Sequence, residues 1–206
     1  YKMLNMAPAL DPLTKVMIAN NIYVNQIYTL NPDFVQKANV FYNAEPETRD
    51  FKDGKTLDVI NQWASDHTEQ MIQKVLDEKE FNIHAVSYLL NAIYFNGAWT
   101  LKFDKEETVD EVFNHAGDTD ELIWRPMMHK TAVFNYGEND DYQALRLPYG
   151  NESFTMTVML PKKDTYEAVP KVPTAEEWES LNRRMVAKTV DVKLPRIETD
   201  TDIDLK

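Results

Sequence analysis

The residue types that most often carry out catalysis are few and scattered in this sequence. The chain has four histidines, and no two of them have the spacing that places a pair of metal ligands on one helix or strand. They are His67, His84, His115 and His129. No serine stands in a G-x-S-x-G motif, five glycines leave no glycine-rich loop for a phosphate, and cysteine is absent. We therefore expect no enzymatic activity, no metal ion and no cofactor.

Two polar motifs could do something other than catalysis. Asp200, Asp202 and Asp204 alternate near the end of the sequence, but the turn glycine and the distal glutamate of a calcium loop are absent there. We interpret them as the solvated face of an extended segment. The sequence Asn151-Glu152-Ser153 has the form of an N-glycosylation site, yet a hairpin turn favours the same residue types. Whether Asn151 carries a glycan is therefore left open.

Asn91 raises the main question, because its carboxamide lies inside the apolar stretch LLNAIYFNGAW at positions 89–99. That stretch lacks helical amphipathicity and is rich in strand-forming residues, which predicts a strand covered on both faces. A buried carboxamide without a hydrogen-bond partner costs about 1–3 kcal/mol. Residue type alone favours the simpler interpretation, in which a neighbouring backbone group satisfies Asn91 and the residue has no wider role.

The overall composition is that of a globular protein with an acidic balance. Lys and Arg number 22 and Asp and Glu number 34, so the formal charge is −12. Binding to nucleic acid or to an anionic membrane surface depends on cationic contacts, and we therefore expect neither partner. No apolar run approaches the roughly 18 residues of a membrane span, and the first residues show no signal-peptide pattern.

The first half of the chain contains predicted strands and helices in alternation. Ile18–Val24 is β-branched and aromatic, which predicts a strand, and Asn31-Pro32-Asp33 is typical of a helix start. Phe34, Ala38 and Phe41 then follow at helical spacing and should form one buried stripe. A long amphipathic helix is predicted over Thr56–Leu76, followed by a central strand over Ala85–Phe95.

The second half is dominated by predicted strands. Leu145, Leu147 and Tyr149 alternate before the turn residues 150–152, and the alternation resumes from Phe154 to Leu160, which predicts a hairpin. Thr174 and Glu177 form a capping box that should open a helix. A last strand is predicted over residues 188–197, with Val190, Val192 and Leu194 on one side. Strands in long series with separate helices indicate an α+β fold.

Several short sequence motifs of this chain resemble motifs of the serpins. They occur in the same order and extend over nearly all 206 residues. The stretch that begins at Asn91 is similar to the third strand of the main serpin sheet and its continuation. Its matching residues are Asn91, Tyr94, Phe95, Gly97, Trp99, Phe103, Thr108 and Phe113. INQWASDHTEQMI is similar to the serpin F helix and contributes Asn61, Thr68 and Ile72. Shorter matches are RPMM at 125–128, LRLPY at 145–149, VMLP at 158–161 and LPRI at 194–197.

The resemblance implies a serpin fold, with a large mixed β-sheet, packed helices and a second, mostly antiparallel sheet region. Residues 1–206 would be one partial domain truncated at both ends, without the N-terminal helices and the reactive-centre loop. We expect such a piece on its own to inhibit no protease. Gln70 departs from the pattern, because many serpins have glycine there, and this puts the local helix packing in doubt.

The resemblance also implies a mechanism and a set of site residues. Serpins are suicide inhibitors of serine proteases whose cleaved reactive loop inserts as a new strand into the main sheet. The loop would enter beside residues 85–95, and the helix Thr56–Leu76 would lie across the sheet and have to yield. The implied shutter, where the sheet parts, comprises Asn91, Asn61, Thr68 and Ile72. The implied breach, where the loop first enters, comprises Trp99 and Gly97. Asn91 would bond across the opening gap.

The implied partner is a serine protease, with a cysteine protease as the alternative target. We expect a monomer in an extracellular or periplasmic location. A non-inhibitory serpin, acting as a binding, carrier or chaperone-like protein, is the alternative function, because the hinge of the reactive loop that separates the two classes is not in this sequence.

Overall fold

The computed structural model describes residues 6–7, 9–113, 122–162, 173–199 and 201. His115 and the alternating Asp200, Asp202 and Asp204 lie outside the described residues. Contacts within the chain form two compact units, Tyr1–Gly97 and Ala98–Lys206. Each unit is described by itself below, and the expectation of one partial serpin domain stays a prediction.

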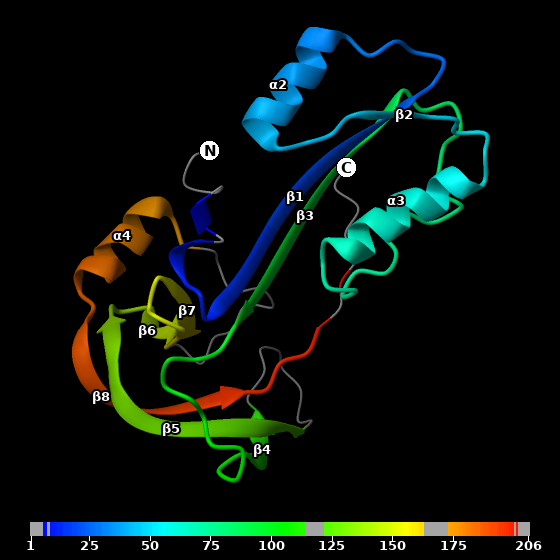
Figure 1. The fold of residues 1–206 in the computed structure, drawn as a ribbon. Helices are drawn as coiled ribbons and strands as arrows, with labels where there is room; N and C mark the ends of the chain where they lie inside the picture. The colour runs from blue at the N-terminus through cyan, green and yellow to red at the C-terminus, as the bar shows by residue number, and fades with distance from the viewer. Residues whose placement is uncertain (1–5, 8, 114–121, 163–172, 200, 202–206) are drawn as a thin grey trace. The chain divides into compact units, whose positions relative to one another are not determined.

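The first unit is built on a three-stranded mixed sheet. Strands β1 (Thr14–Asn25) and β3 (Ser87–Gly97) run antiparallel side by side along their lengths, from Thr14 opposite Gly97 to Val24 opposite Ser87 (Figure 1). The short strand β2 (Glu47–Arg49) pairs with β1 in parallel, so the order is β2-β1-β3. The predicted strand Ile18–Val24 is confirmed as part of β1.

Helix α2 (Pro32–Tyr42) begins as the sequence predicts. The Asn31 side chain accepts a hydrogen bond from the Asp33 backbone N–H at 2.9 Å, and Pro32 occupies the first turn. The predicted buried stripe is wrong for two of its three members, because only Ala38 is buried while Phe34 and Phe41 are 45% and 54% exposed. The apolar face of α2 is therefore wider than the surface that the described residues bring against it.

Helix α3 (Lys55–Asp66) packs on one face of the β1–β3 pair. Its residue Ile60 is fully buried in a cluster with Tyr23 of β1 and Phe51. The Phe51 and Tyr88 rings lie 5.4 Å apart between centroids, so β3 also contributes to this core. Alternation along a strand places Tyr23 and Tyr88 on the same face of the sheet, and α3 covers that face.

The predicted helix Thr56–Leu76 is ten residues too long at its C-terminal end, since α3 ends at Asp66. Glu69 and Gln70 have φ angles of 51° and 64°, a left-handed conformation that no α-helix can contain. The Gln70 backbone N–H donates to the Ser65 carbonyl at 2.8 Å, a bond between residues five apart that closes a Schellman-type end. Apolar residues continue at helical spacing after Gln70, but the backbone reverses its direction there.

The second unit is an antiparallel sheet with one helix. Its elements are β4 (Val109–Phe113), β5 (Ile123–Glu138), β6 (Tyr142–Tyr149), β7 (Phe154–Pro161), α4 (Ala175–Arg183) and β8 (Val186–Pro195). The order is β4-β5-β6-β7, and β8 pairs with β5, which curves strongly in Figure 1. Phe134, Leu147, Val192 and Leu194 form its buried core. The α+β fold class is confirmed.

Local signals in this unit are confirmed at residue level. The predicted hairpin forms β6 and β7, with Tyr149 opposite Phe154 and Gly150 in a left-handed turn conformation at φ 48°. Thr174 and Glu177 make both bonds of the capping box at the start of α4. Among the described residues, no helix is long and apolar enough to span a bilayer.

Candidate functional site

Strand β3 lies at the edge of its sheet, and one of its faces is open. Leu89 and Ile93 are 74% and 63% exposed, and Asn91 between them is exposed as well. On the opposite face Ala92 is buried, and Leu90 packs against the α3 cluster. The prediction of a central strand with both faces covered is therefore wrong for the described residues: β1 is the central strand, and Asn91 is not buried.

Asn91 is bonded to the neighbouring strand through its side chain. Its Nδ2 donates to Oδ1 of Asn20 on β1 at 2.9 Å, and lies 3.4 Å from the Ala19 carbonyl. Asn20 in turn donates from Nδ2 to the Tyr42 carbonyl at 2.9 Å. Asn20 lies on the side of β3 that is already paired, so the expected bond from Asn91 across an opening gap stays a prediction.

Asn61, Thr68 and Ile72 are brought together at the end of α3. The Asn61 side chain accepts from the backbone N–H of Val75 at 2.8 Å and of Leu76 at 3.0 Å, and donates to the Leu76 carbonyl at 3.0 Å. The Thr68 hydroxyl is buried, donates to the Ala64 carbonyl at 2.8 Å and accepts from the Ile72 N–H at 3.0 Å. These bonds fix the chain that leaves α3 back onto the helix.

Gly97 and Trp99 follow at the end of β3. Gly97 is its last residue and pairs with Thr14 in the first unit, whereas Trp99 belongs to the second unit. There the Trp99 ring stacks on the Tyr149 ring with centroids 4.3 Å apart and planes at 16°. The segment is fixed further by the Gly150 N–H, which donates to the Ala98 carbonyl at 2.9 Å.

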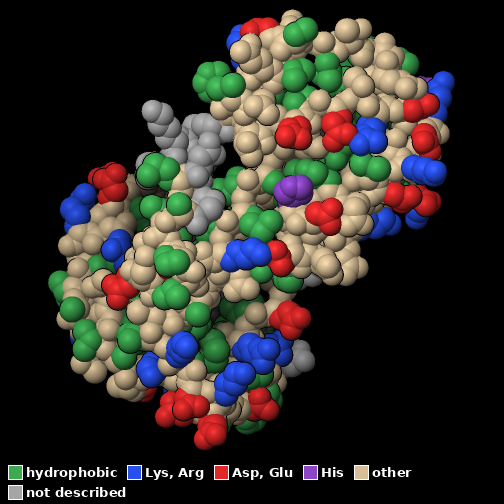
Figure 2. Space-filling view, in the orientation of Figure 1, with side chains coloured by type: hydrophobic (Ala, Val, Ile, Leu, Met, Phe, Trp, Pro, Cys, Tyr) green, Lys and Arg blue, Asp and Glu red, His purple; other side chains and the backbone are tan. Residues whose placement is uncertain are grey.

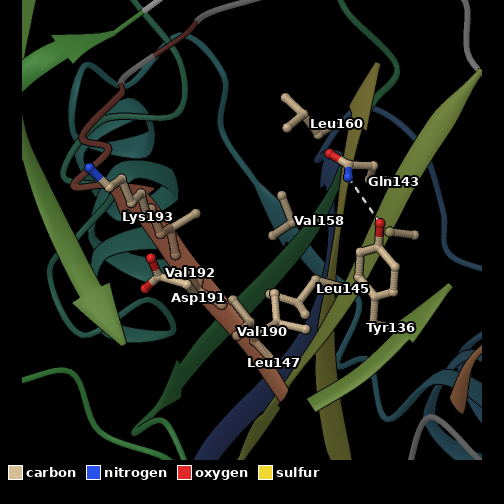
Figure 3. A pocket seen from close by; sticks show the side chains of 12 residues that line it. Tyr136, Gln143, Leu145, Leu147, Val158, Leu160, Val190, Asp191, Val192 and Lys193 are labelled. Carbon is tan, nitrogen blue, oxygen red and sulfur yellow. Dashed lines mark hydrogen bonds between the residues drawn. The ribbon is translucent and has the colours of Figure 1, made fainter. Parts of the chain in front are cut away.

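The second unit contains an apolar cavity of about 370 Å³ between the β6–β7 hairpin and β8 (Figure 3). Its walls are leucine and valine side chains of β6, β7 and β8, such as Leu145, Val158 and Val192. The polar groups at its rim are engaged with protein partners: Gln143 Nε2 donates to the Tyr136 hydroxyl at 2.9 Å, and Asp191 accepts from a threonine of β5. The cavity offers apolar packing surface rather than groups placed for catalysis.

One titratable group with a shifted pKa is Glu111 on β4. Its carboxylate accepts from Lys193 Nζ of β8 at 2.8 Å and lies 3.0 Å from His129 Nε2 of β5. The hydrogen bond from Lys193 is the main cause that holds the pKa of Glu111 below its ordinary value, with the charges of Lys193 and His129 adding to it. This group links three strands, and sequence spacing gave no sign of it.

Nothing in the described part of the chain resembles a catalytic or metal centre. No group of three or more histidine, cysteine or acidic side chains there could hold a metal ion. On the faces seen in Figure 2, acidic and basic side chains are interspersed. The arrangement can pack, pair strands and bond amides, and among the described residues β3 has one unpaired edge and exposed apolar side chains.

Two partners of the site residues were missed by the sequence reasoning. Asn20 could have been found in the sequence, because Asn20 and Asn21 place two side-chain amides inside IANNIYV, a segment otherwise typical of a strand. Tyr149 was recognised only as a strand residue of the hairpin, and its stacking on Trp99 depends on a contact between distant parts of the chain.

Comparison with known proteins gives a consistent result. The family model described as serpin (serine protease inhibitor) matches residues 2–206. Neuroserpin from Homo sapiens is 28% identical over 215 residues, covering 98% of this chain and 51% of that protein. Serpin B3 from Homo sapiens is 31% identical over 200 residues, covering 93% and 50%. The structure of ovalbumin from emu (Dromaius novaehollandiae) superposes with a TM-score of 0.87 at 22% identity, covering 95% of this chain and 52% of that one. The chain thus spans about half the length of these relatives.

Proposed function

Because this chain belongs to the serpin family, we propose that the complete protein is a suicide inhibitor of serine proteases. A protease attacks a reactive loop and forms an acyl-enzyme, and the cleaved loop then inserts as a new strand beside β3. The insertion carries the protease with it and distorts its active site.

The observation that carries this proposal is the composition of β3, a strand of 11 residues without a charged residue or a proline. In the described part of the chain, the sheet order β2-β1-β3 ends at β3. An edge of 11 residues with exposed apolar side chains such as Leu89 and Ile93 is a template for another strand. Natural proteins usually blunt such an edge with charges or proline, and β3 contains neither. This composition suits a strand that has a further strand beside it in the complete protein, and an inserted loop would be such a strand.

The site residues take the following roles under this proposal. Asn91 acts at the shutter by bonding β3 to β1 through Asn20, so that the two strands move as one when the sheet parts. Asn61, Thr68 and Ile72 act indirectly, since they hold the end of α3, which lies over the sheet and has to yield. Gly97 and Trp99 form the breach, at the end of β3.

The expected partner is a serine protease, with a cysteine protease as the alternative, and the expected location is extracellular or periplasmic. Inhibition is expected from a monomer without cofactor. These expectations follow from the family.

The test is to mix the complete protein with trypsin-like, chymotrypsin-like and elastase-like proteases and to examine the products by denaturing electrophoresis. A covalent complex that survives denaturation, formed with an active protease but not with one whose catalytic serine is blocked, supports the proposal. Cleavage of the protein by every protease without such a complex would contradict inhibition and favour the alternative of a non-inhibitory binding or carrier protein.

A further inference from the structure

A line of side-chain amides joins β3, β1 and the end of α2. Asn91 and Asn20 face each other directly in the antiparallel register, with the bond from Asn91 Nδ2 to Asn20 Oδ1 at 2.9 Å. Asn20 Nδ2 then reaches the carbonyl of Tyr42, the last residue of α2, also at 2.9 Å. Three elements that are far apart in sequence are thereby linked in series.

The direction of each bond in this line is fixed by its last member. A backbone carbonyl can only accept a hydrogen bond, so the amino group of Asn20 must face Tyr42. The oxygen of Asn20 must then face Asn91, and Asn91 must present its own amino group. The orientation of the Asn91 carboxamide is therefore tied to Tyr42, which Asn91 does not touch, and the Ala19 carbonyl at 3.4 Å from Asn91 Nδ2 favours the same orientation.

The amide line is partly open to solvent, since Asn91 and Tyr42 are exposed. The amides lie in a cavity of about 430 Å³ whose lining is mainly apolar and includes Phe34, Ala38 and Leu89. The orientation still matters there, because a donor facing a donor, or an acceptor facing an acceptor, leaves a hydrogen bond unmade.

We propose that Asn20 is a positioning residue for Asn91, which fixes the direction of its carboxamide and couples the edge strand β3 to the C-terminal end of α2. The hydrogen bonds among Asn91, Asn20 and Tyr42 do not depend on the proposed function, whereas their consequence for inhibition rests on it. A strand arriving at β3 would then be sensed at α2 through the amide line.

The test uses hydrogen–deuterium exchange on the complete protein, read at two places. One is β3, and the other is the end of α2, where the backbone N–H groups of Asn43 and Ala44 bond back to the Asn39 and Ala38 carbonyls at 2.9 and 3.2 Å. Losing one neutral hydrogen bond should raise exchange roughly five-fold at the element it held.

The two substitutions at position 91 should give opposite patterns. Asn91→Ala removes the bond between the strands and leaves Asn20 on Tyr42, so exchange rises in β3 and not at the end of α2. Asn91→Asp can only accept, so Asn20 turns its amino group toward Asp at that position and its oxygen toward Tyr42. Exchange should then rise at the end of α2, two contacts away, and β3 should stay protected.

Asn96→Asp is the matched control, because it places the same charge on the same strand. The Asn96 side chain is exposed and donates to the Tyr94 hydroxyl at 3.1 Å. This variant should leave exchange at the end of α2 unchanged. Asn20→Ala breaks both links, and exchange should rise in β3 and α2 together.

The proposal is overturned if Asn91→Asp leaves the end of α2 as protected as in the unmodified protein, or if Asn91→Ala affects α2 as much as Asn91→Asp does. Either result would mean that Asn20 does not transmit the orientation. Because exchange is measured without a protease, a failure to form covalent complexes would contradict the proposed function and leave this test intact.

Discussion

Replacing Gln70 by glycine should stabilise the protein, because the backbone at this position is left-handed. Its φ of 64° costs a residue with a side chain roughly 1–2 kcal/mol, which glycine avoids. Glycine loses more freedom on folding, which returns roughly 0.5–1 kcal/mol. The expected net gain is about 0.5–1 kcal/mol. Gln70 is exposed, so the substitution uncovers little apolar surface.

The same substitution at Gln62 is the matched control. Gln62 is also exposed, but it lies inside α3, and its Nε2 donates to Asp66 at 2.7 Å one turn later. Glycine there costs about 1 kcal/mol in helix propensity, and losing the side-chain bond costs about 0.2–0.5 kcal/mol more. The same substitution of Gln by Gly should therefore raise the free energy of unfolding at one position and lower it at the other, eight residues away in sequence.

Equilibrium unfolding in urea measures the free energy of unfolding of both variants. The dependence of that free energy on urea concentration is compared between them to confirm that their unfolded states are alike. The midpoint should move up for Gln70→Gly and down for Gln62→Gly, with a separation of about 2 kcal/mol in the free energy of unfolding. If Gln70→Gly lowers the midpoint as Gln62→Gly does, the left-handed turn that ends α3 is wrong and the helix continues through this position.

Three further predictions concern the ends of α3 and β3 and the charge cluster. Asn61→Ala should lower the free energy of unfolding by about 1–3 kcal/mol, because three backbone bonds to residues 75–76 are lost; unchanged exchange of those amides would contradict it. Trp99→Ala should lower the free energy of unfolding by about 2–3 kcal/mol, measured from the denaturant midpoint. Trp99→Phe should lower it less, because a ring still stacks on Tyr149, and equal losses would contradict the stacking. Glu111 has a lowered pKa, so its contribution to stability is present above its unfolded-state pKa and is lost as pH falls through the folded-state value. Lys193→Gln should raise the pKa of Glu111 toward its ordinary range and reduce the loss of stability on acidification, measured by carboxyl NMR titration and by midpoints at several pH values.

The parts of the fold that follow from the sequence are those with a local physical cause. Asn31 caps α2 because its side-chain oxygen can accept a hydrogen bond from a free backbone N–H group in the first turn of the helix. Thr174 and Glu177 satisfy each other's backbone donors and need no distant partner. Gly150 reverses the β6–β7 hairpin because it tolerates a positive φ. Each of these requires only neighbouring residues.

The end of α3 could not be predicted in the same way. Met71 and Val75 continue the apolar period of the helix, yet they are 78% and 42% exposed. The usual sign of a left-handed helix end is glycine, and this chain has Gln70 there. Buried Thr68 and the three bonds of Asn61 outweigh that local cost, and they become visible only when the chain has already turned back.

The pattern around Asn91 misled the prediction for a related reason. An apolar run without helical periodicity predicts a strand buried on both faces, but Leu89 and Ile93 are exposed. Hydrophobicity reports what a segment will bury in any state of the protein, whereas the structure contains one state. Under the proposed function, β3 lies beside the inserted loop, and a strand in that position has to carry the composition of a central strand. The amide bond from Asn91 to Asn20 fits the same requirement, because it ties β3 to β1 on the paired side and leaves the other edge able to receive a strand without breaking that bond.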